Sequence, residues 1–293
     1  MWGGSSIASR ADQPGLLKRT HMLNVIKQRI QQGYRTIAYP AGQLPQMPPR
    51  YRGLPVVDSN KCPEGCAKCM EACPTSAITM VANATGDRPS ELKIDLGRCL
   101  FCTDCMDACP ENAITYTQEF RLATLSREHL LTDGRAYQLA ASLDEKSRKL
   151  FGHSLQLRQV SAGGCNACEA DINVLSTVVF DLGRFGIKIV ASPRHADGLL
   201  VTGPVTQNMR LALQKTYAAT PAPKFVIAVG ACAISGGPFV DHQEQYNGCD
   251  CVVPVDMYIP GCPPHPLTIL DGLLRLLGRI ENKNNGRDLK ELS

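Results

Sequence analysis

The feature that most constrains this chain is its set of 14 cysteines, 12 of which fall into short, regularly spaced groups. Eight of them form two similar blocks, and in each block the last cysteine is followed by Pro, two further residues and Ala-Ile-Thr. The blocks are Cys62-x3-Cys66-x2-Cys69-x3-Cys73 and Cys99-x2-Cys102-x2-Cys105-x3-Cys109. Such an internal repeat predicts one structural unit built from two equivalent halves.

The cysteines are better suited to metal than to disulfides. The first ten residues contain no apolar core flanked by a basic start and a small-residue cleavage site, so we expect a cytoplasmic protein. Thiols stay reduced in that compartment, and thiolates are the soft ligands that iron–sulfur clusters require.

The spacing of the second block is typical of a 4Fe-4S site. In such a block the first three thiolates bind one cluster, and the fourth binds a neighbouring cluster. The first block has one extra residue between its first two cysteines. If the fourth cysteines are exchanged, two clusters have the following ligands: Cys62, Cys66, Cys69 and Cys109 for one, and Cys99, Cys102, Cys105 and Cys73 for the other. A pair of zinc sites is the alternative, because Cys-x2-Cys pairs also bind zinc.

The C-terminal region alternates short β-rich runs with helical ones, as in a parallel sheet covered by helices. We expect strands at 155–160, 187–191, 198–202, 225–229 and 257–259, and helices at 171–185, 206–217 and 266–279. The predicted fold class is therefore α/β, with a two-cluster ferredoxin-like domain followed by a flavodoxin-like, doubly wound parallel sheet. The order of the strands in the sheet cannot be read from one sequence.

Four further cysteines follow three of the predicted strands: Cys165, Cys168, Cys232 and Cys262. The carboxyl ends of parallel strands share one edge of the sheet, so these thiolates are expected to meet there and hold a third 4Fe-4S cluster. Adjacent glycines let the backbone approach the cluster closely. A flavin is the rival ligand for such a sheet, but residues 161–165, Ser-Ala-Gly-Gly-Cys, are not a Ser/Thr-rich phosphate loop.

The remaining segments are expected to connect the domains or to pack against another surface. Leu16–Gln32 is predicted to be a basic amphipathic helix, which packs on its own domain or lies on a membrane or partner. The proline-rich stretch 39–55 is predicted to be an extended connector, and 126–150 a helical one. We expect four segments: 1–60 with the helix and the connector, 61–120 with the ferredoxin-like domain, 121–153 as linker, and 154–293 with the third cluster.

Charge and hydropathy exclude two classes of partner. The formal net charge is +4, and the basic residues are mixed with acidic ones rather than gathered in a stripe, so nucleic acid is not expected. The apolar runs are shorter than the roughly 20 residues that cross a bilayer or are interrupted by charges. Cys249 and Cys251 lie outside the three ligand sets and are expected to be free thiols.

Several longer motifs resemble a known family. The C-terminal motifs are GCNAC at 164–168, SPRHAD at 192–197, VTGPV at 201–205, VGAC at 229–232, SGG at 235–237 and PVDMYIPGCPP at 254–264. They resemble the small subunit of membrane-bound group 4 nickel-iron hydrogenases of the formate hydrogenlyase type and its homologue, the 20 kDa (PSST) subunit of complex I. GRCLFC at 97–102 and EFRLA at 119–123 resemble the two-cluster ferredoxin-like subunit of the same complexes. The chain looks like a fusion of the two subunits.

The resemblance implies an electron-transfer oxidoreductase subunit with three 4Fe-4S clusters. Its implied partners are a large subunit with a nickel-iron centre, membrane arm subunits and an upstream electron donor or acceptor, at the inner face of the cytoplasmic membrane. Cys165, Cys168, Cys232 and Cys262 would hold the cluster nearest the large subunit's active site. Glu169 matches an acidic position with a possible proton-relay role; at Asp171 relatives often have Glu, and at His265 they vary.

The hydrogenase interpretation has two alternatives. The spaced pair Cys165-x2-Cys168 is similar to the hydrogenase branch, whereas the complex I branch usually has adjacent cysteines there. The main alternative is nevertheless an iron–sulfur subunit of a complex I-related quinone oxidoreductase that lacks nickel. A second alternative, from another class, is a zinc-stabilised interaction protein with no redox function.

Overall fold

A computed structural model of the chain describes residues 16–63, 65–81, 91–132, 137–140 and 154–280. It divides into two compact units, residues 1–37 and 38–293. The first unit contains α1 (Leu16–Gln32), with the bounds that the sequence predicted. Its apolar residues Met22, Val25 and Ile30 are exposed, and the chain leaves the helix at Gly33 with a φ of +59°, a left-handed conformation that glycine adopts without strain.

None of the helices in the described residues is both long enough and apolar enough to cross a membrane.

The second unit begins with an irregular stretch up to residue 54, which includes the predicted extended connector except its last residue, Pro55, and then forms the ferredoxin-like fold. Strand β1 pairs antiparallel with β4, and β3 lies between β2 and β5 in a second antiparallel sheet. The short helices α2 and α3 follow the first cysteines of the two blocks and contain Cys69 and Cys105. The elements of this part are β1 (Pro55–Val57), η1 (Ser59–Lys61), α2 (Lys68–Glu71), β2 (Ile78–Val81), β3 (Glu91–Asp95), α3 (Asp104–Asp107), β4 (Ile114–Tyr116), η2 (Glu128–Leu130) and β5 (Leu131–Thr132).

The C-terminal part is built on a parallel sheet of five strands in the order β10-β9-β8-β6-β7. The first strand of this part, β6, lies between the second and third, so the chain winds outward in both directions, as in flavodoxin-like folds. The predicted fold class is thus confirmed. The strands are β6 (Leu155–Ser161), β7 (Ile187–Ile189), β8 (Gly198–Thr202), β9 (Phe225–Val229) and β10 (Met257–Ile259), each beginning where the sequence predicted.

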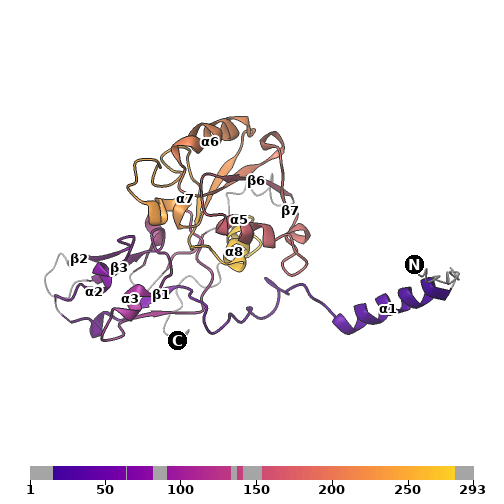
Figure 1. Cartoon of the computed structure of the whole chain (residues 1–293), viewed down its shortest axis with the longest axis horizontal. Helices are drawn as coiled ribbons and strands as arrows, with labels where there is room; N and C mark the ends of the chain where they lie inside the picture. Colours follow the sequence, from indigo (N-terminus) through magenta and orange to yellow (C-terminus); the bar gives the residue numbers. More distant parts are fainter. Residues whose placement is uncertain (1–15, 64, 82–90, 133–136, 141–153, 281–293) are drawn as a thin grey trace, which may run out of the picture. The chain divides into compact units, whose positions relative to one another are not determined.

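Helices cover both faces of this sheet, with α6 on one side and α5 and α8 on the other (Figure 1). The helices and 3₁₀ turns are α5 (Ala167–Val174), η3 (Leu182–Phe185), η4 (Pro193–His195), α6 (Gln207–Ala219), α7 (Ala231–Ser235), η5 (Gly237–Phe239) and α8 (Pro266–Leu276). The helices expected at 206–217 and 266–279 correspond to α6 and α8.

Two helix predictions differ from the structure. The helix expected at 171–185 is replaced by α5, which starts four residues earlier, and by η3, since Asp181 between them has a left-handed φ of +47° that interrupts a helix. In the linker expected to be helical at 126–150, the described residues include η2 and β5, because Ile94 and Asp95 of β3 pair with Thr132 and Leu131. Residues 133–136 and 141–150 of that linker lie outside the described residues.

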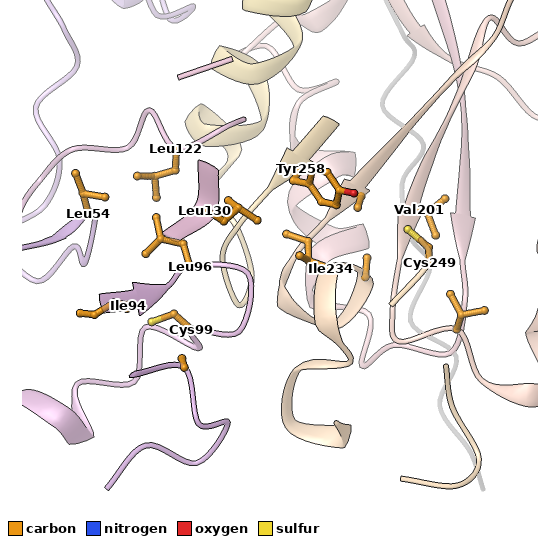
Figure 2. Close-up of a cluster of buried hydrophobic side chains, with 14 of the residues drawn as sticks. Leu54, Ile94, Leu96, Cys99, Leu122, Leu130, Val201, Ile234, Cys249 and Tyr258 are labelled. Carbon is orange, nitrogen blue, oxygen red and sulfur yellow. The ribbon is translucent and has the colours of Figure 1, made fainter. Parts of the chain in front are cut away.

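The ferredoxin-like and C-terminal parts share one hydrophobic core. A buried cluster runs from Leu54 and Ile94 through Leu130 and Tyr258 to Val201 (Figure 2). The contact is close where Gly97 meets α7, because a Cβ on Gly97 would lie 2.7 Å from Cγ2 of Ile234.

Two sets of hydrogen bonds join the same parts. The Oγ of Ser235, in α7, donates to the carbonyl oxygen of Gly97 at 2.8 Å. The backbones of Thr124 and Tyr258 exchange two hydrogen bonds of 3.0 and 2.8 Å, so residue 124 pairs with β10 at the edge of the parallel sheet. The positions of the cysteines in the two parts are therefore fixed relative to one another.

Candidate functional site

The first group of predicted ligands lies together in the ferredoxin-like part. Burial raises the pKa of the Cys62 thiol, and the nearby thiols of Cys66 and Cys109 raise it further. Burial, together with Cys62, Cys105 and Cys109, raises the pKa of Cys69 to about 11. The structure thus brings Cys109, from the second block, beside the first three cysteines of the first block. We call Cys62, Cys66, Cys69 and Cys109 group 1.

The second group shows the reciprocal exchange. The pKa of Cys99 rises to about 12, chiefly through burial, and the thiols of Cys105 and Cys73 add to the effect. Burial and the thiols of Cys102 and Cys73 likewise raise the pKa of Cys105. Cys73, from the first block, therefore lies among the first three cysteines of the second block. We call Cys73, Cys99, Cys102 and Cys105 group 2.

Backbone amides point at several of these sulfur atoms. The N–H of Ala77 donates to Sγ of Cys73 at 3.2 Å, and its counterpart in the repeat, Ala113, donates to Sγ of Cys109 at 3.3 Å. The N–H of Phe101 donates to Sγ of Cys99 at 3.3 Å. Donors of this kind stabilise thiolates and are the usual surroundings of cluster-bound cysteines.

The third group gathers at the carboxyl edge of the parallel sheet, in the loops after β6, β9 and β10. Burial raises the pKa of the Cys168 thiol strongly, and Cys232, Glu169, Cys262 and Cys165 contribute in that order. We call Cys165, Cys168, Cys232 and Cys262 group 3. After burial, neighbouring thiols add to the raised pKa of Cys168, Cys232 and Cys262. The four close thiols form a suitable set of ligands, because a bound cation removes the repulsion between thiolates.

Glycines leave the space that a cluster in group 3 would need. A Cβ on Gly230 would lie 2.6 Å from Sγ of Cys168, and one on Gly237 would lie 2.9 Å from Sγ of Cys232. Both glycines have positive φ, +89° and +55°. A bulky cofactor with sulfur atoms of its own fits a cradle in which backbone replaces side chains.

Groups 2 and 3 face each other across the boundary between the two parts. The Cys102 thiol is close enough to Cys262 to raise its pKa, after the larger effects of burial and of Cys165. The Nη1 of Arg52 holds the loop of Cys102 by donating to the carbonyl oxygens of Phe101 at 2.8 Å and of Cys102 at 3.2 Å. A cavity of about 370 Å³ lies between these loops, and Cys102, Arg52, Cys262 and His265 contribute to its lining.

The acidic candidates beside group 3 have different environments. Burial opposes ionisation of Glu169, but hydrogen bonds from Ser161 and Thr202 outweigh it and hold its pKa below the ordinary value. The bond from Oγ1 of Thr202 to Oε1 of Glu169 is 2.6 Å long. Burial instead raises the pKa of Asp171, which lines the cavity between groups 2 and 3. The proton-relay role of Glu169 stays a prediction.

The other predicted residues lie outside the three groups or at their margin. Cys249 is buried in the shared core and Cys251 is exposed, and their role as free thiols stays a prediction. His265 caps α8, since its Nδ1 accepts a hydrogen bond from the N–H of Leu267 at 3.1 Å. Its ring packs edge-on against Tyr51, with 5.5 Å between the ring centroids.

Within the part of the chain that the structure describes, no three Cys, His, Asp or Glu side chains are arranged to hold a single metal ion. A 4Fe-4S cluster makes a different demand, because each of its four cysteines binds a different iron atom and the sulfurs lie farther apart than the ligands of one ion.

Sequence reasoning missed three features of the site. Tyr116 lies among the cysteines of group 2, and its hydroxyl is within hydrogen-bonding distance of two of them. Arg52 holds the loop of Cys102 from a stretch predicted only to be a connector. Helix α7 carries Cys232 but has only five residues, too few for a helical period to be seen in the sequence.

Known families match both parts of the chain. Residues 165–276 match the family described as NADH ubiquinone oxidoreductase, 20 Kd subunit, and residues 61–113 match the 4Fe-4S dicluster domain. The fold and these matches define the class: an iron–sulfur subunit of an oxidoreductase. More particularly, the chain belongs to the 20 kDa subunit family of NADH ubiquinone oxidoreductase, and it carries a 4Fe-4S dicluster domain ahead of that region.

Individual relatives come from both hydrogenase and quinone oxidoreductase complexes. Formate hydrogenlyase subunit 7 of Escherichia coli is 45% identical over 152 residues, which cover 52% of this chain and 60% of that protein. The probable membrane-bound hydrogenase subunit mbhJ of Pyrococcus furiosus is 42% identical, over 47% of this chain and 83% of that protein. An NADH-quinone oxidoreductase subunit of Heliobacterium modesticaldum is also 42% identical, over 41% and 70%. The chain thus spans less than two thirds of the formate hydrogenlyase subunit.

Proposed function

We propose that this chain relays electrons through three 4Fe-4S clusters, held by groups 1, 2 and 3, to or from the catalytic large subunit of a membrane-associated complex. The observation that carries the proposal is that Cys102 and Cys262 line the same cavity, which brings the ferredoxin-like ligands next to those of the α/β part. A 4Fe-4S cluster, when bound, accepts and releases single electrons. No substrate bond is made or broken by the residues of this chain.

The three groups of cysteines lie in an order that fits an electron relay. Group 1 lies beside group 2, since Cys105 contributes to the raised pKa of Cys69. Group 2 in turn lies beside group 3, so the three sets form a chain of neighbours. The shared hydrophobic core and the hydrogen bond from Ser235 to Gly97 hold that spacing, and a fixed spacing is what repeated electron transfer requires.

We further propose that the large partner is a nickel-iron hydrogenase subunit in a formate hydrogenlyase-like complex, attached through membrane arm subunits to the inner face of the cytoplasmic membrane. The spaced pair Cys165-x2-Cys168 and the 45% identity to formate hydrogenlyase subunit 7 support this choice. An upstream donor or acceptor would exchange electrons with group 1 or 2.

The second candidate is a complex I-related quinone oxidoreductase without nickel. The 42% identity to the NADH-quinone oxidoreductase subunit of Heliobacterium modesticaldum favours it. The two candidates differ in the partner. If the partner is a hydrogenase, the complex purified through this chain should contain nickel and should reduce a viologen dye with hydrogen. A complex free of nickel that reduces quinone would overturn the hydrogenase proposal and leave the relay intact.

The cluster count is tested by analysing the full chain purified without oxygen. Three clusters correspond to about 12 iron and about 12 acid-labile sulfide per chain. Zinc in place of iron, with no labile sulfide, would instead support the zinc-stabilised interaction protein and end the relay proposal.

Group 3 is tested separately with Cys232→Ser. This change removes one of its four thiolates, so we expect one EPR signal to disappear and the iron content to fall toward about 8, while the two ferredoxin-type signals remain. Cys251→Ser is the matched control, because Cys251 is an exposed thiol outside the three groups, and it should keep all three signals. An unchanged spectrum in Cys232→Ser would rule out the assignment of group 3.

A further inference from the structure

Tyr116 is placed among the ligands of group 2. It is the last residue of β4, and its hydroxyl oxygen lies 3.8 Å from Sγ of Cys99 and 3.7 Å from Sγ of Cys105. These distances are within the range of hydrogen bonds to sulfur. The ring is held in place by Phe101, whose centroid is 6.2 Å away at an interplanar angle of 52°. The hydroxyl therefore lies beside two of the four sulfurs, on a side chain that packs against the buried core.

The direction of these hydrogen bonds follows from the chemistry of the partners. A cysteine that binds iron does so as a thiolate, which has no proton and can only accept. The phenol keeps its proton at neutral pH, so Tyr116 is the donor. An added electron increases the negative charge on the ligand sulfurs, and a donated hydrogen bond is then stronger. Such a bond favours the reduced state and raises the reduction potential.

The internal repeat provides a comparison within the same chain. Cys73 and Cys109 are equivalent in the two blocks, and so are Ala77 and Ala113, which donate to them at nearly equal distances of 3.2 and 3.3 Å. At the position equivalent to Tyr116 the first block has Met80. A thioether cannot donate a hydrogen bond. The donors at Ala77 and Ala113 are thus matched, while the side chain at the position of Tyr116 differs.

We propose that Tyr116 sets the reduction potential of the group 2 cluster above that of the group 1 cluster, so that an electron in the ferredoxin-like part settles beside Cys262. This inference rests on the proposed relay and adds a direction to it within the ferredoxin-like part. The residue acts through the ligand sulfurs of Cys99 and Cys105.

The test is Tyr116→Phe in the full chain, purified without oxygen, with the EPR signal of each cluster followed as a function of applied potential. Loss of the hydroxyl should lower the ratio of reduced to oxidised group 2 cluster about tenfold at a fixed potential, equivalent to about 59 mV for one electron. The potentials of the other two clusters should not move. Tyr246→Phe is the control, because the Tyr246 hydroxyl contacts Arg210 on an exposed surface.

A second measurement tests whether the Tyr116 hydroxyl donates a hydrogen bond to the sulfurs or only packs beside them. After exchange into D2O, electron–nuclear double resonance on the reduced group 2 cluster should show a coupled deuteron that is missing in Tyr116→Phe. If Tyr116→Phe fails to assemble the cluster, a chain with 3-fluorotyrosine at position 116 is used in place of that variant. The more acidic phenol is a stronger donor, so it should shift the potential upward.

The possible failures are distinguishable. A chain without labile sulfide would end the proposed relay and this inference together. A chain with three clusters, in which Tyr116→Phe leaves both the group 2 potential and the deuteron coupling unchanged, would overturn only the role of Tyr116. An upward shift in Tyr116→Phe, or a downward one with 3-fluorotyrosine, would overturn it as well.

Discussion

At the scale of single residues, Gly230 shows how backbone geometry decides what can bind. Its φ of +89° and ψ of 157° belong to a conformation used almost only by glycine, and it brings the chain against Sγ of Cys168. We expect Gly230→Ala to cost roughly 1–3 kcal/mol in strain and to displace Cys168. The group 3 EPR signal should be lost or strongly reduced, and iron analysis of the purified variant measures the same loss.

Gly42→Ala is the control for that prediction. Gly42 also has a positive φ, +94°, but the nearest atom to an added Cβ is Cβ of Ala38 at an ordinary 3.7 Å. This variant should lose some stability through strain and keep all three clusters. Equal cluster loss in both variants would mean that strain alone, rather than the approach to Cys168, explains the effect.

The grouping of the cysteines could be predicted from the sequence, because their spacing is typical of 4Fe-4S ligands. The exchange of Cys73 and Cys109 between the blocks followed from the same spacing rule, and the structure brings these thiols together accordingly. Tyr116 and Arg52 could not be predicted in this way. One hydroxyl on a strand, or one guanidinium in an irregular stretch, has no characteristic spacing, and only the folded chain brings it to a sulfur or a carbonyl.

At the scale of elements, α8 is a fully buried helix that contains a polar pair. The Oδ2 of Asp271 accepts a hydrogen bond from Nε of Arg275 at 2.7 Å, and its Oδ1 accepts one from the hydroxyl of Tyr39. Asp271→Ala removes the carboxylate that both groups bind. Breaking a buried ion pair in this way costs about 3–5 kcal/mol, so we expect a large fall in the free energy of unfolding, measured by chemical denaturation.

A change on an exposed helix position is the reference for this prediction. Lys215→Ala lies on the exposed face of α6 and should alter stability by less than about 0.5 kcal/mol. If Asp271→Ala is no less stable than Lys215→Ala, the contribution of the Asp271–Arg275 pair is offset by the cost of burying its charges, and the predicted loss of stability is wrong.

The strands of the parallel sheet were predictable because buried parallel strands consist of short continuous apolar runs, such as Phe-Val-Ile-Ala-Val in β9. The helix expected at 171–185 was wrong in its bounds, because α5 already ends at Val174 and the left-handed Asp181 prevents a continuous helix as far as residue 185. The strand order was not accessible, because it depends on packing between segments that are far apart in the chain.

At the scale of the whole molecule, the ferredoxin-like and α/β parts behave as one compact unit, residues 38–293. The closeness of Cys102 and Cys262 predicts a magnetic interaction between the clusters of groups 2 and 3 when both are reduced. We expect the group 3 EPR signal to broaden, and to saturate at higher microwave power, as group 2 becomes reduced. Potential-controlled EPR spectra measure both effects.

Cys232→Ser provides the control for this interaction. The interaction is mutual, so without the group 3 cluster the group 2 signal should be narrower than in the unmodified chain, while its own potential remains that of a ferredoxin-type cluster. A group 3 signal that is indifferent to reduction of group 2 would contradict the proposed relay order, since it would place the two clusters too far apart to interact.

The pairing of Thr124 with Tyr258 has a consequence for fragments of the chain that are produced separately. β10 is the last strand on its side of the sheet, and an uncovered outer strand offers its free amides and carbonyls to any other chain. A fragment that starts at residue 154 would retain the cysteines of group 3 but lose this cover. Such a fragment is expected to self-associate through the uncovered edge of β10.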